Sequence, residues 1–244
     1  MVKKNNNKIS YGSWLSIANE DVAEVFCNYN FDFIVIDMEH SKYSVNQACN
    51  LIRIIKLKNK KAFVRLPNID ERLIKIFLDF GADGLIAPMI NNTQDVKKLI
   101  KYSYHLPIGS RGVSLNRSSD YGRNFEKNLR ESRKKIMLFV QIESLEAVKN
   151  IDYIFNEKKI HGFIIGPYDL SLSLGIPGQF HNKKFLEIEN KILTKAKKYK
   201  KILGAHIIEP SSEEISKAIK KKYKFIACGV DFKIIGDALN KIIK

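Results

Sequence analysis

Charged side chains follow apolar runs at two places in the first third of this sequence. The run F-D-F-I-V-I-D ends on Asp37, and Glu39 and His40 follow after one intervening residue, Met38. The run A-F-V-R-L carries Arg65 near its end. Because side chains of a strand alternate between its two faces, Asp37 and Glu39 would share one face at a strand end. A carboxylate, an imidazole and a guanidinium in such a place can move a proton and hold an oxyanion.

Two further carboxylates follow apolar runs later in the chain. M-L-F-V-Q-I-E places Gln141 and Glu143 on one side of a strand end, and G-F-I-I-G-P-Y-D ends on Asp169. Two carboxylates with room for water and a bidentate ligand suit a hard divalent cation, so we expect Glu143 and Asp169 to hold Mg²⁺ or Mn²⁺, with Co²⁺ as another option. The cation would act as a Lewis acid on a carbonyl oxygen and stabilise an enolate, with His40, oriented by Asp37, as the base.

Each of these residues also has a purely structural interpretation. A carboxylate after a strand can cap the next helix, an arginine can pair with it, and a single histidine is usually structural. Their combination on one rim is what favours catalysis. A Schiff-base lysine is the competing way to stabilise the same carbanion, but Lys61 and Lys224 open their strands at the opposite, stability face. We therefore prefer the metal route.

Eight short β-rich runs must position these groups. We expect strands over Ser10–Ile17, Phe31–Asp37, Lys61–Leu66, Gly84–Ile90, Ile136–Glu143, Gly162–Gly166, Leu203–Ile208 and Lys224–Gly229. Helical periodicity lies between most of them, as in Val45–Lys58 and Asp70–Phe80. Alternating strands and helices favour parallel pairing, and eight units predict a single (β/α)8 TIM barrel domain over residues 1–244. An open doubly wound sheet is the alternative.

Two segments stand outside this alternation. Pro107–Arg133 is rich in Gly, Ser, Arg and Asn and is too long to be a simple connection, so it is either a substrate-covering loop or an excursion without function. A helix over Asp231–Lys244 closes the chain, and exposed terminal helices of this kind often serve subunit contacts.

Charge and cysteine content bear on compartment and partners. The formal charge of +16 would suit nucleic acid, but the lysines spread over many segments without a zinc-finger or stacked-aromatic RNA motif. We expect no nucleic-acid partner and keep a non-catalytic basic binding protein as a minor alternative. The three cysteines lack a pairing motif and suit a reducing compartment. With no apolar run long enough for a membrane span and no signal core, we expect a cytoplasmic protein without a membrane partner.

Five motifs resemble the HpcH/HpaI aldolase family in order and spacing. They are D-M-E-H at 37–40, V-R-L-P at 64–67, L-D-F-G-A-D-G-L-I-A-P-M at 78–89, Q-I-E at 141–143 and G-P-Y-D-L-S-x-S-L-G at 166–175. The similarity covers nearly the whole chain. It implies a metal-dependent, class II pyruvate aldolase on a TIM barrel, an aldehyde-lyase that splits a keto-deoxy sugar acid or hydroxy-oxo-dioate into pyruvate and an aldehyde. It also implies a homo-oligomer, usually a hexamer.

The resemblance assigns roles to individual residues. It implies metal ligands at Glu143 and Asp169, pyruvate-binding groups at Gln141 and the Tyr168/Asp169 backbone, the base at His40, and a transition-state stabiliser at Arg65. Asp79 matches an aspartate that reaches a neighbouring subunit's site and raises the histidine's basicity. Arg117 aligns with a loop arginine that meets the aldehyde half of the substrate.

Two stretches leave the substrate open. Many relatives have Gly after D-M-E-H, where this chain has S-K-Y at 41–43, which puts the preference for the acceptor aldehyde in doubt. G-A-H-I-I-E-P at 204–210 resembles a branch whose reactions are less settled. There, His206 and Glu209 either touch the aldehyde or, for His206, simply pack in a strand. An acyl-CoA lyase, like relatives of the citrate lyase beta chain, is the alternative enzyme.

Overall fold

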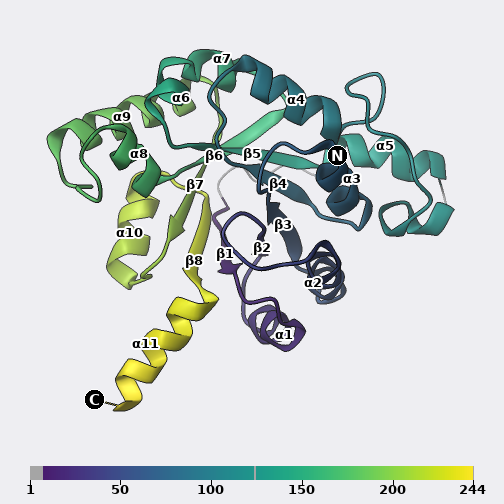
Figure 1. The fold of residues 1–244 in the computed structure, drawn as a ribbon, viewed down its shortest axis with the longest axis horizontal. Helices are drawn as coiled ribbons and strands as arrows, with labels where there is room; N and C mark the ends of the chain where they lie inside the picture. Colours follow the sequence, from purple (N-terminus) through teal and green to yellow (C-terminus); the bar gives the residue numbers. More distant parts are fainter. Residues whose placement is uncertain (1–7, 124, 244) are drawn as a thin grey trace.

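Eight parallel strands close into a barrel in sequence order in a computed structural model that describes residues 8–123 and 125–243 (Figure 1). The strands are β1 (Ser10–Leu15), β2 (Phe33–Asp37), β3 (Lys61–Arg65), β4 (Gly84–Ala87), β5 (Met137–Ile142), β6 (Ile160–Ile165), β7 (Ile202–Ile207) and β8 (Phe225–Val230). Strand β1 pairs with both β2 and β8, which completes the ring. The predicted (β/α)8 barrel is confirmed, and the open sheet is excluded.

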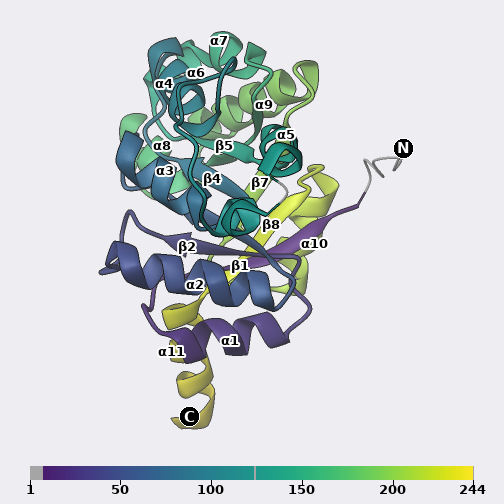
Figure 2. The same cartoon turned by 90° about the vertical axis from the view of Figure 1, so that its right-hand side faces the viewer.

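Helices return the chain from the carboxyl end of each strand to the amino end of the next, and they surround the barrel in Figures 1 and 2. They are α1 (Glu20–Asn28), α2 (Val45–Leu57), α3 (Glu71–Asp79), α4 (Thr93–Ser103), the 3₁₀ helix η1 (Arg117–Gly122), α5 (Phe125–Lys135), α6 (Leu145–Lys149), α7 (Ile151–Asn156), α8 (Pro167–Ser173), α9 (Lys183–Lys198), α10 (Ser212–Lys220) and α11 (Asp231–Ile243). Capping boxes begin two of them, Ser44 with Gln47 before α2 and Asn92 with Asp95 before α4.

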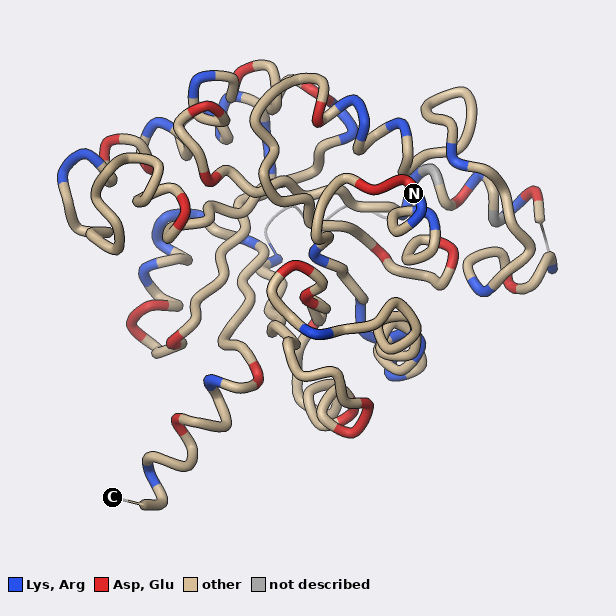
Figure 3. The backbone as a smooth tube through the Cα atoms, in the orientation of Figure 1, with Lys and Arg blue, Asp and Glu red and all other residues tan. Residues whose placement is uncertain are grey.

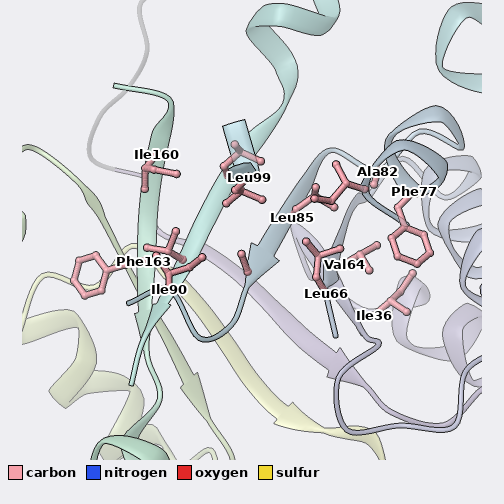
Figure 4. Packing of buried hydrophobic residues seen from close by; sticks show 14 of the residues in the cluster. Ile36, Val64, Leu66, Phe77, Ala82, Leu85, Ile90, Leu99, Ile160 and Phe163 are labelled. Carbon is pink, nitrogen blue, oxygen red and sulfur yellow. The ribbon is translucent and has the colours of Figure 1, made fainter. Parts of the chain in front are cut away.

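Two apolar layers hold the barrel. Inside it, Phe33 and Phe225 stack with ring centroids 3.7 Å apart. Phe63 contacts both of these rings edge-on, and Phe139 contacts Phe225 with its ring tilted. Outside it, the other faces of the strands pack on the helices, as Figure 4 shows for Phe77 of α3 on the side of β3. Because four phenylalanine rings fill the interior, the barrel is a solid core with its polar groups at the strand ends.

Two strands, β1 and β4, end at least two residues earlier than their sequences predict. β1 stops at Leu15 because the N–H groups of Ser16 and Ile17 donate to Asp231, at 2.8 and 2.7 Å, instead of pairing with a strand. β4 stops at Ala87, and the backbone then turns through Met89, whose φ is 53°. In both places the chain leaves the strand geometry at the end of the barrel where the polar side chains lie.

The segment Pro107–Arg133 does not cover the carboxyl ends of its own strands. It contains η1 and all but the last two residues of α5, helices that were not predicted, and η1 packs on α3. The side chain of Arg117 passes about 4 Å from where a Cβ on Gly81 would lie. Gly81 precedes β4, so this segment lies at the amino ends of the strands, and the expectation of a lid over the chain's own site is wrong.

Helix α11 leaves the barrel after its first turn and projects away from it in both views (Figures 1 and 2). Its root is fixed by Asp231, which is fully buried. Further along, Phe232, Leu239 and Ile242 are exposed. The sequence prediction of a terminal helix is confirmed up to Ile243, and Lys244 lies outside the described residues.

Charge is distributed rather than concentrated. Figure 3 shows lysines and arginines on helices all around the barrel, interspersed with acidic residues. Many are paired, for example Lys56 with Asp83 at 2.8 Å and Lys221 with Glu189 at 2.8 Å. Among the described helices, none has the length and apolar character needed to cross a membrane.

Candidate active site

Asp37 and Arg65 form the most buried ion pair at the carboxyl ends of the strands. They are direct partners in the register between β2 and β3. The Arg65 Nε donates to Asp37 Oδ1 at 2.9 Å and its Nη2 to Oδ2 at 2.6 Å, which makes a two-pronged contact. Burial by itself raises the pKa of Asp37, but the hydrogen bonds and charge of Arg65 outweigh it and the pKa is lowered. Asp37 is therefore a carboxylate committed to holding Arg65.

The third nitrogen of Arg65 points across the rim. Nη1 lies 3.1 Å from Glu39 Oε2 and 3.5 Å from Gln141 Oε1. Burial raises the pKa of Glu39 against the lowering effect of Arg65, and the charge of Glu143 raises it further. One guanidinium thus connects β2 with the end of β5 and offers its outer edge to a ligand between them.

Glu143 follows β5 directly and is almost completely buried. Its Oε1 accepts from the Met89 backbone N–H at 2.6 Å, and its Oε2 accepts from the Gln141 amide. Burial raises the pKa of Glu143 against these two hydrogen bonds, and the negative charge of Asp169 raises it as well. A Cβ on Gly166 would lie only 2.6 Å from Glu143 Oε2, so the backbone of β6's end approaches this carboxylate as only glycine allows.

Asp169 lies in the first turn of α8, which begins at Pro167, and its side chain is exposed. It makes no hydrogen bond or ion pair with any of the described residues, yet it is close enough to act on the charge state of Glu143. The preceding Tyr168 is also exposed, with its ring edge-on to Phe180 at 5.0 Å. Because first-turn N–H groups have no partner within a helix, those of Tyr168 and Asp169 are available to an anion.

These two carboxylates fit a hard divalent cation. Glu143 is fixed by two hydrogen bonds, Asp169 is unpaired among the described residues, and the negative charge of Asp169 makes ionisation of Glu143 less favourable. Over residues 8–123 and 125–243, no cluster of three or more His, Cys, Asp or Glu side chains could hold a metal. A pair of carboxylates leaves positions for water and substrate, as Mg²⁺ and Mn²⁺ require.

His40 differs from its expected arrangement. Its imidazole is largely exposed, at 70% of the side-chain surface, and Nε2 lies 3.8 Å from Glu39 Oε2. Only its backbone N–H reaches Asp37 Oδ1, at 3.3 Å. Asp37 therefore positions the loop that carries His40 and does not orient the ring, because Arg65 occupies both of its oxygens.

Asp79 and Arg117 lie at the other end of the barrel. Asp79 ends α3 and is hydrogen-bonded to Arg111, with both side chains buried. Arg117 lies beside Gly81 in the same region. The structure therefore brings neither residue to the Glu143 rim of its own chain, and the roles implied for them require a second subunit.

The lysines considered for Schiff-base chemistry stay at the amino ends. Lys61 is the first residue of β3 and is exposed, and Lys224 immediately precedes β8. Within the described part of the chain, the lysine with a strongly lowered pKa is Lys201, where burial brings the value to about 8. Its ammonium donates to the carbonyls of Glu157 and Ile160, both at 2.7 Å, at the start of β6. Its place is structural and distant from the rim.

The sequence missed a stack of side chains next to Arg65. The ring of Trp14 lies parallel to that of His206, with centroids 4.3 Å apart, and the Arg65 guanidinium carbon lies 5.1 Å from the Trp14 ring centroid. Alternation along β1 and β7 pointed both rings inward, but their contact depends on the barrel. Glu209, by contrast, is exposed and pairs with Lys233 at 3.2 Å, outside this stack.

Comparison with known families identifies the family of this chain. The model of the HpcH/HpaI aldolase/citrate lyase family matches residues 10–238. The chain belongs to this family. It is accordingly an enzyme of the aldolase and lyase kind, and the resemblance inferred from the motifs is confirmed.

Individual proteins that are similar to this HpcH/HpaI family member include named aldolases. It is 29% identical over 231 residues to a 2-keto-3-deoxy-L-rhamnonate aldolase from Salmonella gallinarum, covering 94% of this chain and 85% of the relative. The enzyme of the same name from Klebsiella pneumoniae is also 29% identical, covering 94% and 86%. The solved citrate synthase SbnG is similar with a TM-score of 0.88 and 27% identity, covering 98% and 93%. An HpcH/HpaI aldolase from Desulfitobacterium hafniense shares the fold, with a TM-score of 0.89, 24% identity and coverage of 97% and 92%.

Proposed function

We propose that this HpcH/HpaI family enzyme is a class II pyruvate aldolase, which cleaves a 4-hydroxy-2-keto acid of the keto-deoxy sugar acid kind into pyruvate and an aldehyde. The observation that carries the proposal is the arrangement of Glu143, Asp169 and Gln141 on the side of the rim toward which Arg65 Nη1 points. The names of the curated relatives, 2-keto-3-deoxy-L-rhamnonate aldolases, support the same substrate class.

A divalent metal belongs to this proposal. Aldolases of this family generally depend on one, and Glu143 and Asp169 are the residues that would hold it here. When bound, the metal supplies Lewis acidity to the carbonyl group of the keto acid. The choice among Mg²⁺, Mn²⁺ and Co²⁺ is left to the experiment below.

The protein's own groups bind the pyruvate half of the substrate. The substrate carboxylate accepts hydrogen bonds from the first-turn N–H groups of Tyr168 and Asp169, where the α8 amino end favours negative charge. Gln141 lies beside Glu143 and orients the 2-keto group. Because Gln141 and Glu143 are both buried, water is largely excluded from this half of the site.

Bond cleavage then needs one proton transfer and one oxyanion stabiliser. His40 takes the proton of the 4-hydroxyl group, the C3–C4 bond breaks, and its electron pair moves into the pyruvate half as an enolate. The 4-carbon leaves as an aldehyde. Arg65 Nη1, held toward Gln141 by the two-pronged contact with Asp37, donates to the oxygen on which charge develops. Protonation of the enolate at C3 gives pyruvate.

We also propose that the enzyme is a homo-oligomer, with a hexamer as the family-based expectation. The apolar side chains along α11 that remain exposed in a single chain support an interface there. Subunit contacts at the amino ends of the strands would bring Asp79 and Arg117 to a neighbour's rim, where Arg117 would meet the aldehyde half. For Asp79 to act there, it would have to do so while paired to Arg111.

The experiment uses purified protein freed of metal with a chelator. Mg²⁺, Mn²⁺ or Co²⁺ is returned, and 4-hydroxy-2-keto acids of graded length are supplied, including 2-keto-3-deoxy-L-rhamnonate. Lactate dehydrogenase and NADH report pyruvate. We expect pyruvate release that requires the metal and is lost in Glu143→Ala and Asp169→Ala, whereas Lys56→Gln at the opposite end of the barrel retains it.

Absence of metal-dependent pyruvate from every acid would refute the proposal. Binding of coenzyme A in a calorimetric titration, together with cleavage of a 3-hydroxyacyl-CoA ester, would instead favour an acyl-CoA lyase. Salt-sensitive binding of polyanions without any pyruvate chemistry would favour a basic binding protein.

A further inference from the structure

The position of Trp14 is explained by its ring faces and not by its N–H group. Trp14 is the only tryptophan of the chain and is 2% exposed inside the barrel. Its Nε1 is buried without a hydrogen-bond partner among the described residues. A buried donor without an acceptor is unfavourable, so other contacts must fix this ring.

Those contacts come from two directions around the barrel. Strand β1, which carries Trp14, has β8 and then β7 on one side, and β2 and then β3 on the other. His206 comes from β7 and stacks on Trp14 with an interplanar angle of 10° and a centroid distance of 4.3 Å. Arg65 comes from β3 and places its guanidinium carbon 5.1 Å from the same ring. Trp14 thus connects His206 to Arg65.

His206 is held as a neutral ring. Burial lowers its pKa to about 4, with the charge of Arg65 acting in the same direction against the Gly229 carbonyl and Asp37. Nε2 lies 3.3 Å from the Gly229 carbonyl oxygen, which can only accept, so this contact places the imidazole proton on Nε2. A charged imidazolium here would repel Arg65. A neutral aromatic ring can instead support the indole whose face attracts the guanidinium.

We propose that the Trp14–His206 stack is a positioning device for Arg65, with His206 acting through Trp14 on the orientation of the guanidinium that stabilises the enolate. Asp37 fixes the guanidinium edge by two hydrogen bonds, and Trp14 fixes its plane. Both constraints are needed to aim Nη1 at the ligand between Glu39 and Gln141. The inference rests on the proposed function.

The first test measures exchange of the pyruvate methyl protons with D2O by NMR, in metal-loaded enzyme. We expect His206→Ala to lower the kcat of exchange about 10-fold with little change in the KM for pyruvate. His206→Phe keeps a flat ring and should stay within about 3-fold of the unsubstituted enzyme. Since His206 acts only through Arg65, the double variant His206→Ala/Arg65→Ala should exchange no more slowly than Arg65→Ala alone.

A matched control separates positioning from general loosening of the barrel. Phe225→Leu removes a stacked ring from the deeper interior, away from Arg65. It should lower the melting temperature without lowering the exchange rate. A further 10-fold loss in the double variant would overturn the proposal, as would His206→Phe being as slow as His206→Ala, because a ring nitrogen would then be needed.

A second readout needs no ligand or turnover. Trp14 is the only source of tryptophan fluorescence, so its emission reports its neighbours directly. Arg65→Ala should change that emission in the unsubstituted background and change it much less in the His206→Ala background. Equal changes in both backgrounds would refute the coupling. If the enzyme fails to exchange pyruvate at all, the proposed function fails, while this fluorescence cycle still decides whether His206 positions Arg65.

Discussion

Arg65→Lys is the substitution that most directly tests the geometry of the site. Arginine makes three directed contacts here, two to Asp37 and one toward Glu39 and Gln141. A lysine keeps the positive charge but has one compact ammonium group. This ammonium group can donate hydrogen bonds to Asp37 or to a substrate near Gln141, but not to both at once.

The magnitude follows from those contacts. Loss of one hydrogen bond between charged groups costs about 1.5–3 kcal/mol of folding stability. If the ammonium stays with the buried Asp37, the donor to the developing oxyanion disappears. Removal of one such donor costs roughly 10²–10³-fold in kcat, or about 2.7–4 kcal/mol. We therefore expect a folded protein that has lost most of its activity.

The assay pairs urea unfolding, followed by circular dichroism, with metal-dependent pyruvate release. Lys56→Gln provides the control, since it breaks an ion pair with Asp83 at the amino ends of the strands. It should leave pyruvate release within about 2-fold. Activity of Arg65→Lys within about 3-fold of the unsubstituted enzyme would refute the reasoning. A single positive charge would then be sufficient, and the separately directed N–H groups of the guanidinium would not be needed.

Other perturbations address the metal ligands, the pH dependence and the interface. Glu143→Gln should weaken Mn²⁺ binding by at least about 10-fold in calorimetry; unchanged affinity would remove Glu143 from the ligand set. Gly166→Ala should have a similar effect by a different route, because its Cβ would lie 2.6 Å from Glu143 Oε2 and displace that carboxylate; a crystal structure with Glu143 unmoved would contradict this. Asp37 has a lowered pKa in the folded protein, so its stabilising contribution is present above the ordinary aspartate pKa of 3.8 and is lost as the pH falls through the lower folded value. Asp37→Asn should therefore show a flatter dependence of unfolding free energy on pH below about 4 than the unsubstituted protein does, and parallel curves would exclude the assignment. Leu239→Asp on α11 should shift sedimentation toward smaller species, and an unchanged distribution would place the interface elsewhere.

Local periodicity was enough to predict the barrel and the composition of its rim. Strand side chains alternate with a period of two, so the polar residues at 37, 65, 141 and 143 could be assigned inward from the sequence alone. The chemistry of two carboxylates and an amide then favoured an oxygen-ligated cation. These inferences use neighbours in the chain or the shared edge of parallel strands, and the structure places Asp37 and Arg65 in register as they require.

The predictions that failed depended on contacts between side chains of different strands. From the sequence alone, Asp37 could pair with His40 or with Arg65, and only the register of β2 and β3 decides for the arginine. Likewise, the stack of Trp14 on His206 joins the first strand to the seventh, so no local pattern reveals it. The wrong prediction for Pro107–Arg133 could have been avoided. This segment follows α4, and a chain that leaves a helix of the barrel has already returned to the amino ends of the strands. That signal was present and would have excluded a lid over the same site.

The phenylalanine-filled interior also has a consequence for the order in which the two products leave the enzyme. Because Phe33, Phe63, Phe139 and Phe225 fill the barrel below the rim, a substrate cannot pass through the barrel, and both products leave on the side from which the substrate entered. In the proposed mechanism, the buried Gln141 and Glu143 hold the pyruvate half of the substrate deep in the site, and the exposed His40 meets the aldehyde half above it. The aldehyde must then depart before pyruvate, and in the synthetic direction pyruvate must bind first. Pyruvate should accordingly inhibit cleavage competitively toward the keto acid, and the aldehyde noncompetitively.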